Sequence, residues 1–310
     1  IAVFVPGVVE GSPTYELLVA GVEAAASGRE NASARVVEGG FNQGEWENGL
    51  LALAETGTYE LIVSANPSLP DLAARVAEFN QDARFLILDG YLEGNESIAT
   101  IAFNQREQAF LAGYYAGLVT SSSMEQANSA LRVGLLAGQE YPVMNTVIRP
   151  GYLLGARTAV PAAELDFRVL GNWFDAAGAA DIARSMIESG VDVILAIAGS
   201  ANEGVVAAAR EAGAYALWFD RSGYDVDPDI VAGSTQIALD RAAEEAVLSA
   251  IDGELQFGTA RVLGVADGYV DFDTEARAFQ RIAPQEIQQA MNQMRSRLQD
   301  GELDLSLPLP

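Results

Sequence analysis

The sequence predicts an α/β fold built from two doubly wound parallel sheets. Its expected strands are continuous apolar runs, such as Ile1 to Val5 and Phe85 to Leu88, as in strands that are buried on both faces. Segments with helical spacing separate these runs, and this alternation is typical of parallel sheets covered by helices. The pattern restarts after a polar stretch at 121–128, and a length of 310 residues also suggests about two domains.

In the first half, turn and cap residues bound the expected elements. A strand over 1–5 ends at Pro6. Ser12 then caps a helix that has Pro13 at its first position and continues to about Ser27. Further strands are expected at 34–38, 61–65, 85–88 and 98–103. Further helices are expected at about 46–56, at 69–80 and from 105 onward.

The second half repeats this alternation of strands and helices. Strands are expected at 131–136, 167–170, 191–197, 215–219 and 230–236. Helices are expected at 142–160, 176–189, 203–212, 241–251 and 284–298. Pro150 predicts a break or kink in the first of these helices. A β-like segment follows at 264–272, and the tail from 303 to 310 is expected to be extended or frayed.

Composition excludes several classes of function. The formal net charge is −25, and Arg is the sole basic residue because the sequence has no Lys or His. Such a surface repels phosphate backbones and anionic membranes, so we expect no nucleic-acid partner. The absence of Cys, His and Lys removes Cys nucleophiles, Ser-His-Asp triads, disulfides, His/Cys metal sites and P-loops. No apolar run reaches the length of about 18 residues that a membrane helix needs.

The stretch from 101 to 117 joins the two halves. It begins as an apolar strand ending at Phe103, passes through the polar cluster 104–107, and continues with helical spacing. Polar groups beside a strand end and a helix N-terminus suit small-ligand binding in open α/β folds. A hinge followed by a capped helix without ligand contact explains the same residues equally well.

Other candidate residues also follow expected strands. Trp173 and Trp218 can offer a flat face to a heterocycle or simply pack in the core. Asp220 and Glu140 can accept hydrogen bonds from ligand hydroxyls or cap helices. The acidic run 225–229 is expected to be a solvated loop, and no metal site or catalytic residue is predicted. The expected ligand-binding residues are Ser12, Thr14, Tyr15, Asn66, Phe103, Gln105, Glu107, Glu140, Tyr141, Trp173, Phe174, Trp218 and Asp220.

Four motifs resemble the basic-membrane-protein family of solute-binding lipoproteins of ABC importers. The motifs are Phe103-Asn-Gln-Arg-Glu-Gln-Ala-Phe-Leu-Ala-Gly113, Val133-Gly-Leu-Leu-Ala-Gly-Gln-Glu140, Gly190-Val-Asp-Val-Ile194 with Ala198-Gly199, and Trp218-Phe-Asp220. The resemblance covers nearly the whole chain and implies a type I periplasmic-binding-protein fold. It implies crossovers near 104, 235 and 262. The N-terminal lobe would be 1–104 plus 236–262, and the C-terminal lobe 105–235 plus 263–310.

The resemblance also implies a function. A protein of this family has no catalytic activity and no cofactor, traps a small molecule between its lobes, and docks on an ABC permease. We therefore expect a monomer in the periplasm or on the outer face of the cytoplasmic membrane. Its membrane attachment would be a lipid anchor that these residues do not include.

The expected ligand is riboflavin-like, with a purine nucleoside as the alternative. Nucleoside binders of the family resemble Asp-x-Ser-Phe-Asn near the N-terminus, whereas here Pro13 replaces that aromatic shelf. Ile237 stands where the family carries a Lys expected to hold the sugar. Trp173 matches a family aromatic that stacks on the base. The segment 3–15 is similar to that of spirochaetal riboflavin-binding members.

Two other classes of function remain open at this point. An enzyme without His, Cys or Lys would be a carboxylate-dependent nucleoside or glycoside hydrolase. A ligand-sensing regulator built on the same fold would need a helix-turn-helix segment and a basic face, and neither is visible.

Overall fold

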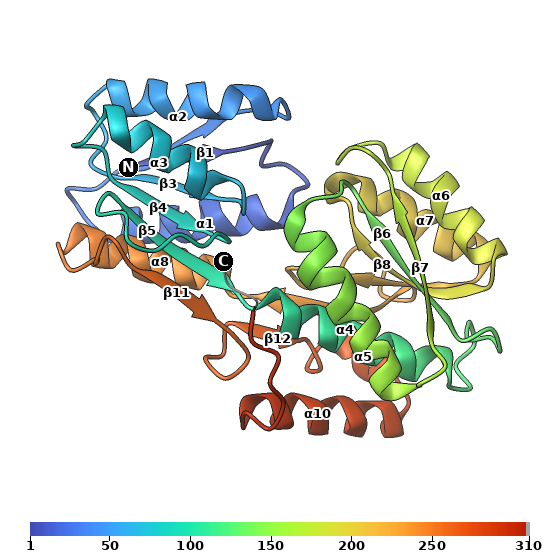
Figure 1. The fold of residues 1–310 in the computed structure, drawn as a ribbon. Helices are drawn as coiled ribbons and strands as arrows, with labels where there is room; N and C mark the ends of the chain where they lie inside the picture. The colour runs from blue at the N-terminus through green and yellow to red at the C-terminus, as the bar shows by residue number, and fades with distance from the viewer. Residues whose placement is uncertain (308–310) are drawn as a thin grey trace. The chain divides into compact units, whose positions relative to one another are not determined.

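The computed structural model describes residues 1–307, which form two compact units (Figure 1). Unit 1 consists of residues 1–103 with 238–263, and unit 2 of 104–237 with 264–307. The chain therefore passes between the units after residues 103, 237 and 263, close to the positions 104, 235 and 262 expected from the sequence.

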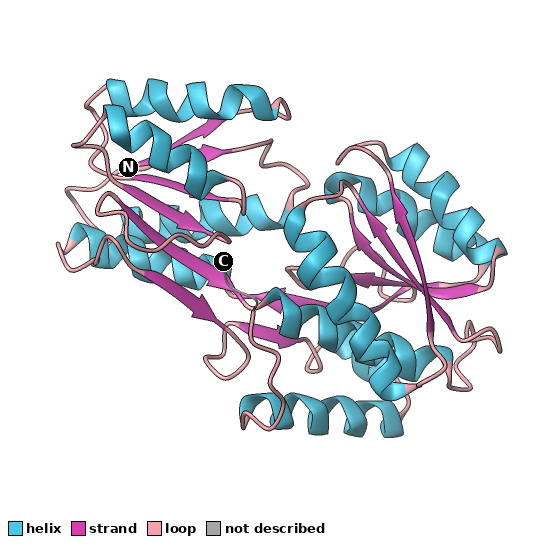
Figure 2. Ribbon diagram, in the orientation of Figure 1, coloured by secondary structure: helices cyan, strands magenta, loops and turns pink. Residues whose placement is uncertain are grey.

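Unit 1 contains a six-stranded parallel sheet in the order β11-β5-β4-β3-β1-β2. The strands are β1 (Ala2–Val5), β2 (Arg35–Glu38), β3 (Ile62–Ala65), β4 (Phe85–Leu88), β5 (Ile98–Phe103) and β11 (Ala260–Leu263). One face is covered by α1 (Pro13–Ser27) and α8 (Leu239–Ile251). The other is covered by α2 (Trp46–Glu55), which follows the 3-10 turn η1 (Gln43–Glu45), and by α3 (Leu69–Phe79) (Figure 2).

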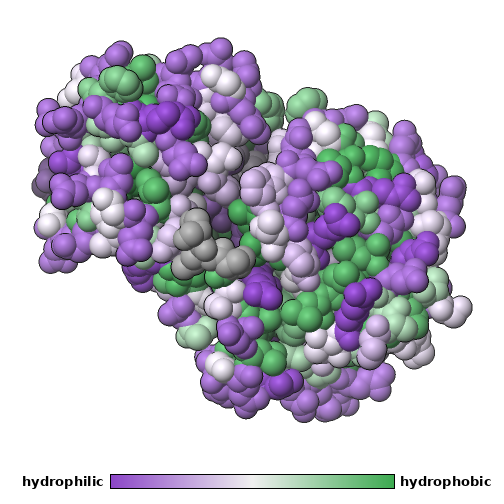
Figure 3. Space-filling model, viewed as in Figure 1, coloured by the Kyte–Doolittle hydropathy of each residue, from purple (hydrophilic) through white to green (hydrophobic). Residues whose placement is uncertain are grey.

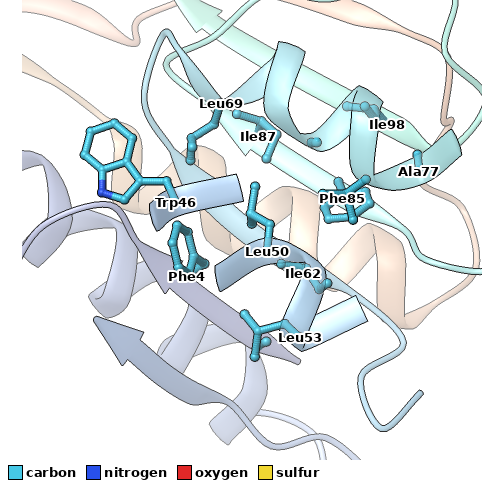
Figure 4. Packing of buried hydrophobic residues seen from close by; sticks show 13 residues of the cluster. Phe4, Trp46, Leu50, Leu53, Ile62, Leu69, Ala77, Phe85, Ile87 and Ile98 are labelled. Carbon is cyan, nitrogen blue, oxygen red and sulfur yellow. The ribbon is translucent and has the colours of Figure 1, made fainter. Parts of the chain in front are cut away.

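The core of unit 1 lies between the sheet and helices α2 and α3 (Figure 4). Strands β1, β3 and β4 are buried at every position, which explains why their sequences do not alternate and are apolar except at Ser64, whose hydroxyl donates to the Phe4 carbonyl oxygen. The Phe4 ring packs directly on glycine backbone. A Cβ atom added at Gly39 would lie 2.6 Å from Phe4 Cζ, and one at Gly49 would lie 2.7 Å from Phe4 Cε2. These two glycines therefore make room for the ring.

Unit 2 contains a second six-stranded sheet, in the order β12-β10-β9-β8-β6-β7, with β12 antiparallel to β10. The strands are β6 (Arg132–Ala137), β7 (Glu164–Val169), β8 (Val191–Ile197), β9 (Tyr215–Trp218), β10 (Val231–Ile237) and β12 (Val270–Phe272). Helices α6 (Ala176–Glu188) and α7 (Asn202–Ala212) cover one face (Figure 1). Helices α4 (Gln105–Thr120) and α5 (Arg149–Ala159) cover the other, and α10 (Gln285–Gln299) packs on α4. The predicted α/β class with two doubly wound sheets is thus confirmed.

Helices α4 and α5 touch backbone to backbone. A Cβ atom at Gly113 would lie 1.9 Å from the carbonyl oxygen of Tyr152, and one at Gly155 would lie 2.1 Å from that of Phe110. Glycine is used here because no other residue allows such a close approach. The glycines in the 101–117 stretch are therefore explained by helix packing.

The second half contains one irregularity that was expected and one difference from the sequence-based expectation. The helical run over 142–159 is irregular just before Pro150, where the π-helical turn η2 (Met144–Ile148) leads into α5, because Pro150 has no N–H to donate and its ring disturbs the preceding turn. The β-like segment 264–272 contains only the short strand β12. Strand β11 precedes this segment, and its partly exposed residues, at the edge of the sheet, do not form an apolar run.

The C-terminal segment is attached more firmly than the sequence suggested. Leu305 is buried, and its carbonyl oxygen accepts a hydrogen bond from Asn104 Nδ2 at 3.1 Å. The carbonyl oxygen of Ser306 accepts a bond from Arg106 Nη1 at 3.1 Å. Residues 303–307 are thus extended but not frayed, and the expectation for 308–310 lies outside the described residues. The short helix α9 (Arg277–Ile282) was not expected.

The face of the protein drawn in Figure 3 is largely hydrophilic, as the net charge of −25 leads one to expect. Within residues 1–307, no helix is both long enough and apolar enough to cross a membrane. Large apolar side chains that are nevertheless exposed include Phe41, Phe79, Leu154, Phe174 and Val226. Phe41 and Phe174 belong to loops that directly follow strands.

Asp192 is a buried carboxylate at the start of β8, with 1% of its surface exposed. Its Oδ2 atom accepts hydrogen bonds from Thr120 Oγ1 at 2.9 Å and from the Asn128 backbone N–H at 2.8 Å. Its Oδ1 atom has no hydrogen-bond partner among the described residues. Burial raises the pKa of Asp192, and the two hydrogen bonds only partly oppose this shift.

We expect the Asp192→Asn variant to gain stability relative to the wild type as the pH rises from about 4.5 to about 8. Because the folded pKa lies above the unfolded one, the protonated carboxyl favours the fold, and this contribution is lost as the pH rises through the folded pKa. The amide cannot ionise, and its oxygen can keep both hydrogen bonds. Urea unfolding at several pH values measures the difference, with Asp181→Asn on the exposed side of α6 as the control. A difference that does not vary with pH would contradict the expectation.

Candidate ligand-binding site

In each unit, aromatic and polar side chains gather where parallel strands end. Parallel strands share one direction, so the loops that follow them lie along a single edge of the sheet. We call the loops after β1, β2, β3 and β4 the carboxyl edge of unit 1. The loops after β6, β7, β8 and β9 form the carboxyl edge of unit 2.

Tyr15 is the central aromatic residue on the carboxyl edge of unit 1. Its ring lies against the backbone after β1, where a Cβ atom at Gly7 would be 2.9 Å from Tyr15 Cε2. Its hydroxyl donates to the carbonyl oxygen of Pro6 at 3.1 Å and accepts from Asn66 Nδ2 at 3.4 Å. Burial raises the pKa of Tyr15 to about 12, and the charge of Asp89 acts in the same direction. The phenol is therefore a neutral group at physiological pH.

Polar residues follow the next two strands of this edge. Asn66 follows β3, and its Oδ1 atom accepts the backbone N–H of Ser68 at 2.9 Å, which closes the turn before α3. Asp89 follows β4 with a φ of 52°, in the left-handed region that residues other than Gly rarely adopt. Of the predicted residues, Thr14 lies half-buried in the first turn of α1, and Ser12, also half-buried, precedes this helix as its N-cap but makes no capping hydrogen bond with its side chain.

Trp173 lies in the loop between β7 and α6, on the carboxyl edge of unit 2. Its ring covers the end of β6, because a Cβ atom at Gly138 would lie only 2.5 Å from Trp173 Cε3. Its carbonyl oxygen accepts hydrogen bonds from Ser200 Oγ at 3.2 Å and from the Ala201 N–H at 3.3 Å, which tie the loop to the end of β8. The Tyr141 ring lies 6.2 Å away at 47°, so two predicted aromatic residues lie together. The tryptophan ring is only half-buried and can contact a ligand.

The neighbours of this aromatic pair are more exposed. Phe174 is 57% exposed, and its backbone N–H donates to Asn172 Oδ1 at 3.0 Å. Glu140 is also exposed, and its Oε2 atom accepts from Asn145 Nδ2 at 3.0 Å. Both predicted residues therefore lie on the same edge as Trp173.

Asp220 follows β9, and both its backbone carbonyl and its carboxylate accept hydrogen bonds. Its φ of 71° is again in the left-handed region, as is frequent for residues at binding sites. Its carbonyl oxygen accepts the Ile237 N–H at 2.9 Å, and its Oδ1 atom accepts from Gln108 Nε2 at 3.2 Å. Gln108 is fully buried and also donates to Thr235 Oγ1 at 3.3 Å. These contacts fix the direction of the Asp220 carboxylate.

The predicted residues near the first crossover lie at or just after the end of β5, which is parallel to β4 and ends at the same edge of the unit 1 sheet. Glu107 Oε2 accepts the Val265 backbone N–H at 2.8 Å, so Glu107 fastens the start of α4 to the segment after the third crossover. Burial raises the pKa of Glu107, and the Asp267 charge raises it further. Phe103 is 2% exposed within β5, and Gln105 is 7% exposed at the start of α4. Phe103 and Gln105 are thus buried, whereas Glu107 is half-buried, as Tyr15 and Trp173 are.

Trp218 is also buried, with 4% of its surface exposed at the end of β9. Its ring packs on Gly223, where a Cβ atom would lie 2.2 Å from Trp218 Cγ. Its Nε1 atom has no hydrogen-bond partner in the described part of the chain. The sequence left two roles open for Trp218, ligand contact and core packing. In the structure its ring packs in the core.

Three residues at the edges or in contact with them were not predicted. Gln108 belongs to the 103–113 motif and closes the polar run at the start of α4, which was a usable signal. Asp89 follows an apolar strand, as Asp220 does, and could have been found by the same rule. Phe41 follows a weak edge strand and a Gly-Gly pair, so its position depends on the fold of the loop. Among residues 1–307, no group of three or more acidic side chains is arranged to hold a metal ion.

Two sheets of this topology, joined by three crossovers, define a type I periplasmic-binding-protein-like fold. A solute-binding protein of an ABC transporter system from Aeropyrum pernix K1 has the same fold, with a TM-score of 0.88 and 19% identity over 100% of this chain and 93% of that one. A transcriptional activator of the comK gene from Bacillus halodurans superposes with a TM-score of 0.74 and 18% identity, over 99% of each chain. At such identities the likeness establishes the fold alone.

Sequence comparison identifies the family. Residues 1–300 match the family described as ABC transporter substrate-binding protein PnrA-like, and the chain belongs to this family. The resemblance to basic membrane proteins is thereby confirmed at the level of the family, whose members are binding components and not enzymes.

Individual relatives share less than a third of their residues with this chain over the matched part. The ABC transporter nucleoside-binding protein BmpA of Lactococcus lactis subsp. cremoris is 29% identical over 157 residues, which are 51% of this chain and 42% of that protein. Basic membrane protein D of Borreliella burgdorferi is 29% identical over 168 residues, 53% of this chain and 47% of that protein. The matches thus span less than half the length of these relatives.

Proposed function

We propose that this chain is the solute-binding component of an ABC importer and that its ligand is riboflavin in preference to a purine nucleoside. The ligand would contact the carboxyl edges of both units, and the loaded protein would dock on a permease. We further propose that it acts as a monomer at the outer face of the cytoplasmic membrane or in the periplasm, anchored by a lipid. Family membership supports the transport role, and the residues of the edges support the choice of ligand.

The observation that carries the proposal is the combination of aromatic rings and a fixed carboxylate on unit 2. The Trp173 ring lies over the end of β6, whereas Asp220 follows β9, with β8 between these strands. Two strand spacings of about 4.8 Å place the two residues about 10 Å apart along the edge. A ligand that contacts both needs a flat ring at one end and hydroxyl groups at the other. Riboflavin, with its tricyclic ring and ribityl chain, has this form.

Ile237 favours riboflavin over a nucleoside. Its backbone N–H is bonded to Asp220, but its side chain is apolar and only 3% exposed. Ile237 therefore cannot provide, next to the Asp220 carboxylate, the positive charge that the family's Lys would offer to a ribose. A tricyclic ring also buries more apolar surface against Trp173 and Tyr141 than a purine does, at about 25 cal/mol per Å².

Unit 1 offers complementary groups to such a ring. The uracil-like edge of the flavin has both donors and acceptors, which an amide such as that of Asn66 can match. The acidic residues Asp89 and Asp220 would disfavour phosphorylated flavins, because like charges would be brought together in a desolvated site. A purine nucleoside remains the second candidate, because the Lactococcus relative is described as nucleoside-binding.

The test is to purify the protein under native conditions and examine what it retains. Native mass spectrometry and visible absorbance are expected to reveal a bound flavin. The released ligand should be recovered unchanged after long incubation with the protein. A hydrolysed product would contradict the binding role, and a retained nucleoside would support the second candidate.

A further inference from the structure

Phe41 is an exposed aromatic side chain on the carboxyl edge of unit 1. It follows β2 in the loop 39–42, and 45% of its surface is exposed. A single exposed apolar side chain is ordinary by itself, but aromatic side chains commonly line ligand sites, which in open α/β folds lie beyond the carboxyl ends of the strands. Its position on the same edge as Tyr15 therefore makes it a candidate for contact with a ligand.

The exposure of Phe41 does not arise from a loose loop. The Gly39 N–H donates to the Val5 carbonyl oxygen at 2.7 Å, and the Gly40 N–H donates to that of Gly7 at 3.0 Å. From the other side, Trp46 Nε1 donates to the Gly40 carbonyl oxygen at 2.8 Å. The Trp46 ring is itself 5% exposed and lies beside Phe4 in the core (Figure 4). Phe41 thus projects from a backbone that is fixed by the core.

The Phe41 ring lies beside Tyr15 at the end of β1. A Cβ atom at Gly7 would be 2.9 Å from Tyr15 Cε2 and 3.8 Å from Phe41 Cε1, so both rings border one point above this strand. Pro13, at the start of α1, is buried and has no aromatic ring to offer here. An aromatic surface on this unit is therefore formed by residues that follow β2 and begin α1.

We propose that Phe41 contacts the ring of the ligand on unit 1 and is a specificity-determining residue for flat heterocycles. The inference rests on the proposed function, which it extends by naming the aromatic contact on the second edge. A planar ring gains more from this face than a sugar does, because stacking depends on the area of the π-system. The proposed binding site then includes the loop after β2, for which the sequence analysis predicted no function.

The test compares Phe41→Ala with Phe79→Ala, in which an 82% exposed phenylalanine at the end of α3 is removed. Riboflavin and inosine are titrated by calorimetry into ligand-stripped wild type and variants. Stacking is worth about 1–3 kcal/mol per ring, so Phe41→Ala should lose about fivefold or more in affinity, with the larger loss for riboflavin. Phe41→Trp should retain the affinity, and Phe79→Ala should bind as the wild type does.

The outcomes separate this inference from the function on which it rests. Wild-type affinity in Phe41→Ala, with normal thermal unfolding, would overturn the role of Phe41 and leave the proposed function intact. An equal loss in Phe79→Ala would also overturn it, because the effect would then not be local. If the wild type binds neither riboflavin nor inosine, both the proposed function and the inference are wrong.

Discussion

Replacing Asp220 by alanine is expected to lower the affinity for riboflavin by about tenfold or more. The Asp220 carboxylate is oriented by Gln108 and follows a backbone that the Ile237 N–H holds in place. Its removal leaves a ligand hydroxyl and the Gln108 amide without their acceptor. An unsatisfied buried hydrogen-bonding group costs about 1–3 kcal/mol, and more where the lost partner was charged. Isothermal titration calorimetry on ligand-stripped protein measures the loss.

Asp220→Asn is the matched control for backbone strain caused by the substitution. Alanine is strained at the φ of 71°, whereas asparagine tolerates this conformation and keeps the shape of the side chain. We expect Asn to restore thermal stability but only part of the affinity. Full affinity in either variant would contradict a ligand contact by this carboxylate.

Trp173→Ala is expected to lower the affinity for riboflavin by about fivefold to about a hundredfold without unfolding the protein. Stacking of a heterocycle on an aromatic ring is worth about 1–3 kcal/mol, which corresponds to this range. The ring is half-buried and packs on Gly138, but the loop is tied to the end of β8 by bonds to the Trp173 carbonyl oxygen, which alanine retains. Calorimetric titration and thermal unfolding of the same sample distinguish binding from stability.

Trp173→Phe tests whether an aromatic face is what matters at this position. A smaller ring should lose less affinity than alanine does. Equal affinities for the alanine variant and the wild type, with normal unfolding, would exclude stacking on Trp173.

The fold could be predicted because most of its strands are buried on both faces. Strands such as β1, β4 and β8 are apolar at nearly every position, so their sequences alone identify them. The prediction succeeded at the partly buried strand β2 but failed at β11. Strand β11 lies at the edge of its sheet, is only partly buried and therefore lacks the apolar pattern.

The site was only partly predictable, for a different reason. Counting residues from the strand ends places Asn66, Trp173 and Asp220 on the carboxyl edges, because a parallel sheet fixes where its loops lie. Whether a side chain near such a position is accessible depends on tertiary packing, which buries Trp218 against Gly223. The role of Gln108 likewise depends on a contact across more than a hundred residues of sequence.

The measurement that tests the central claim most directly is a competition among four ligands. Riboflavin, riboflavin monophosphate, inosine and guanosine are titrated separately into ligand-stripped protein at the same ionic strength. We expect riboflavin to bind most tightly and its monophosphate more weakly, because the site is acidic and the chain carries a net charge of −25. Tighter binding of inosine or guanosine than of riboflavin would contradict the assignment of the ligand and establish a nucleoside-binding protein.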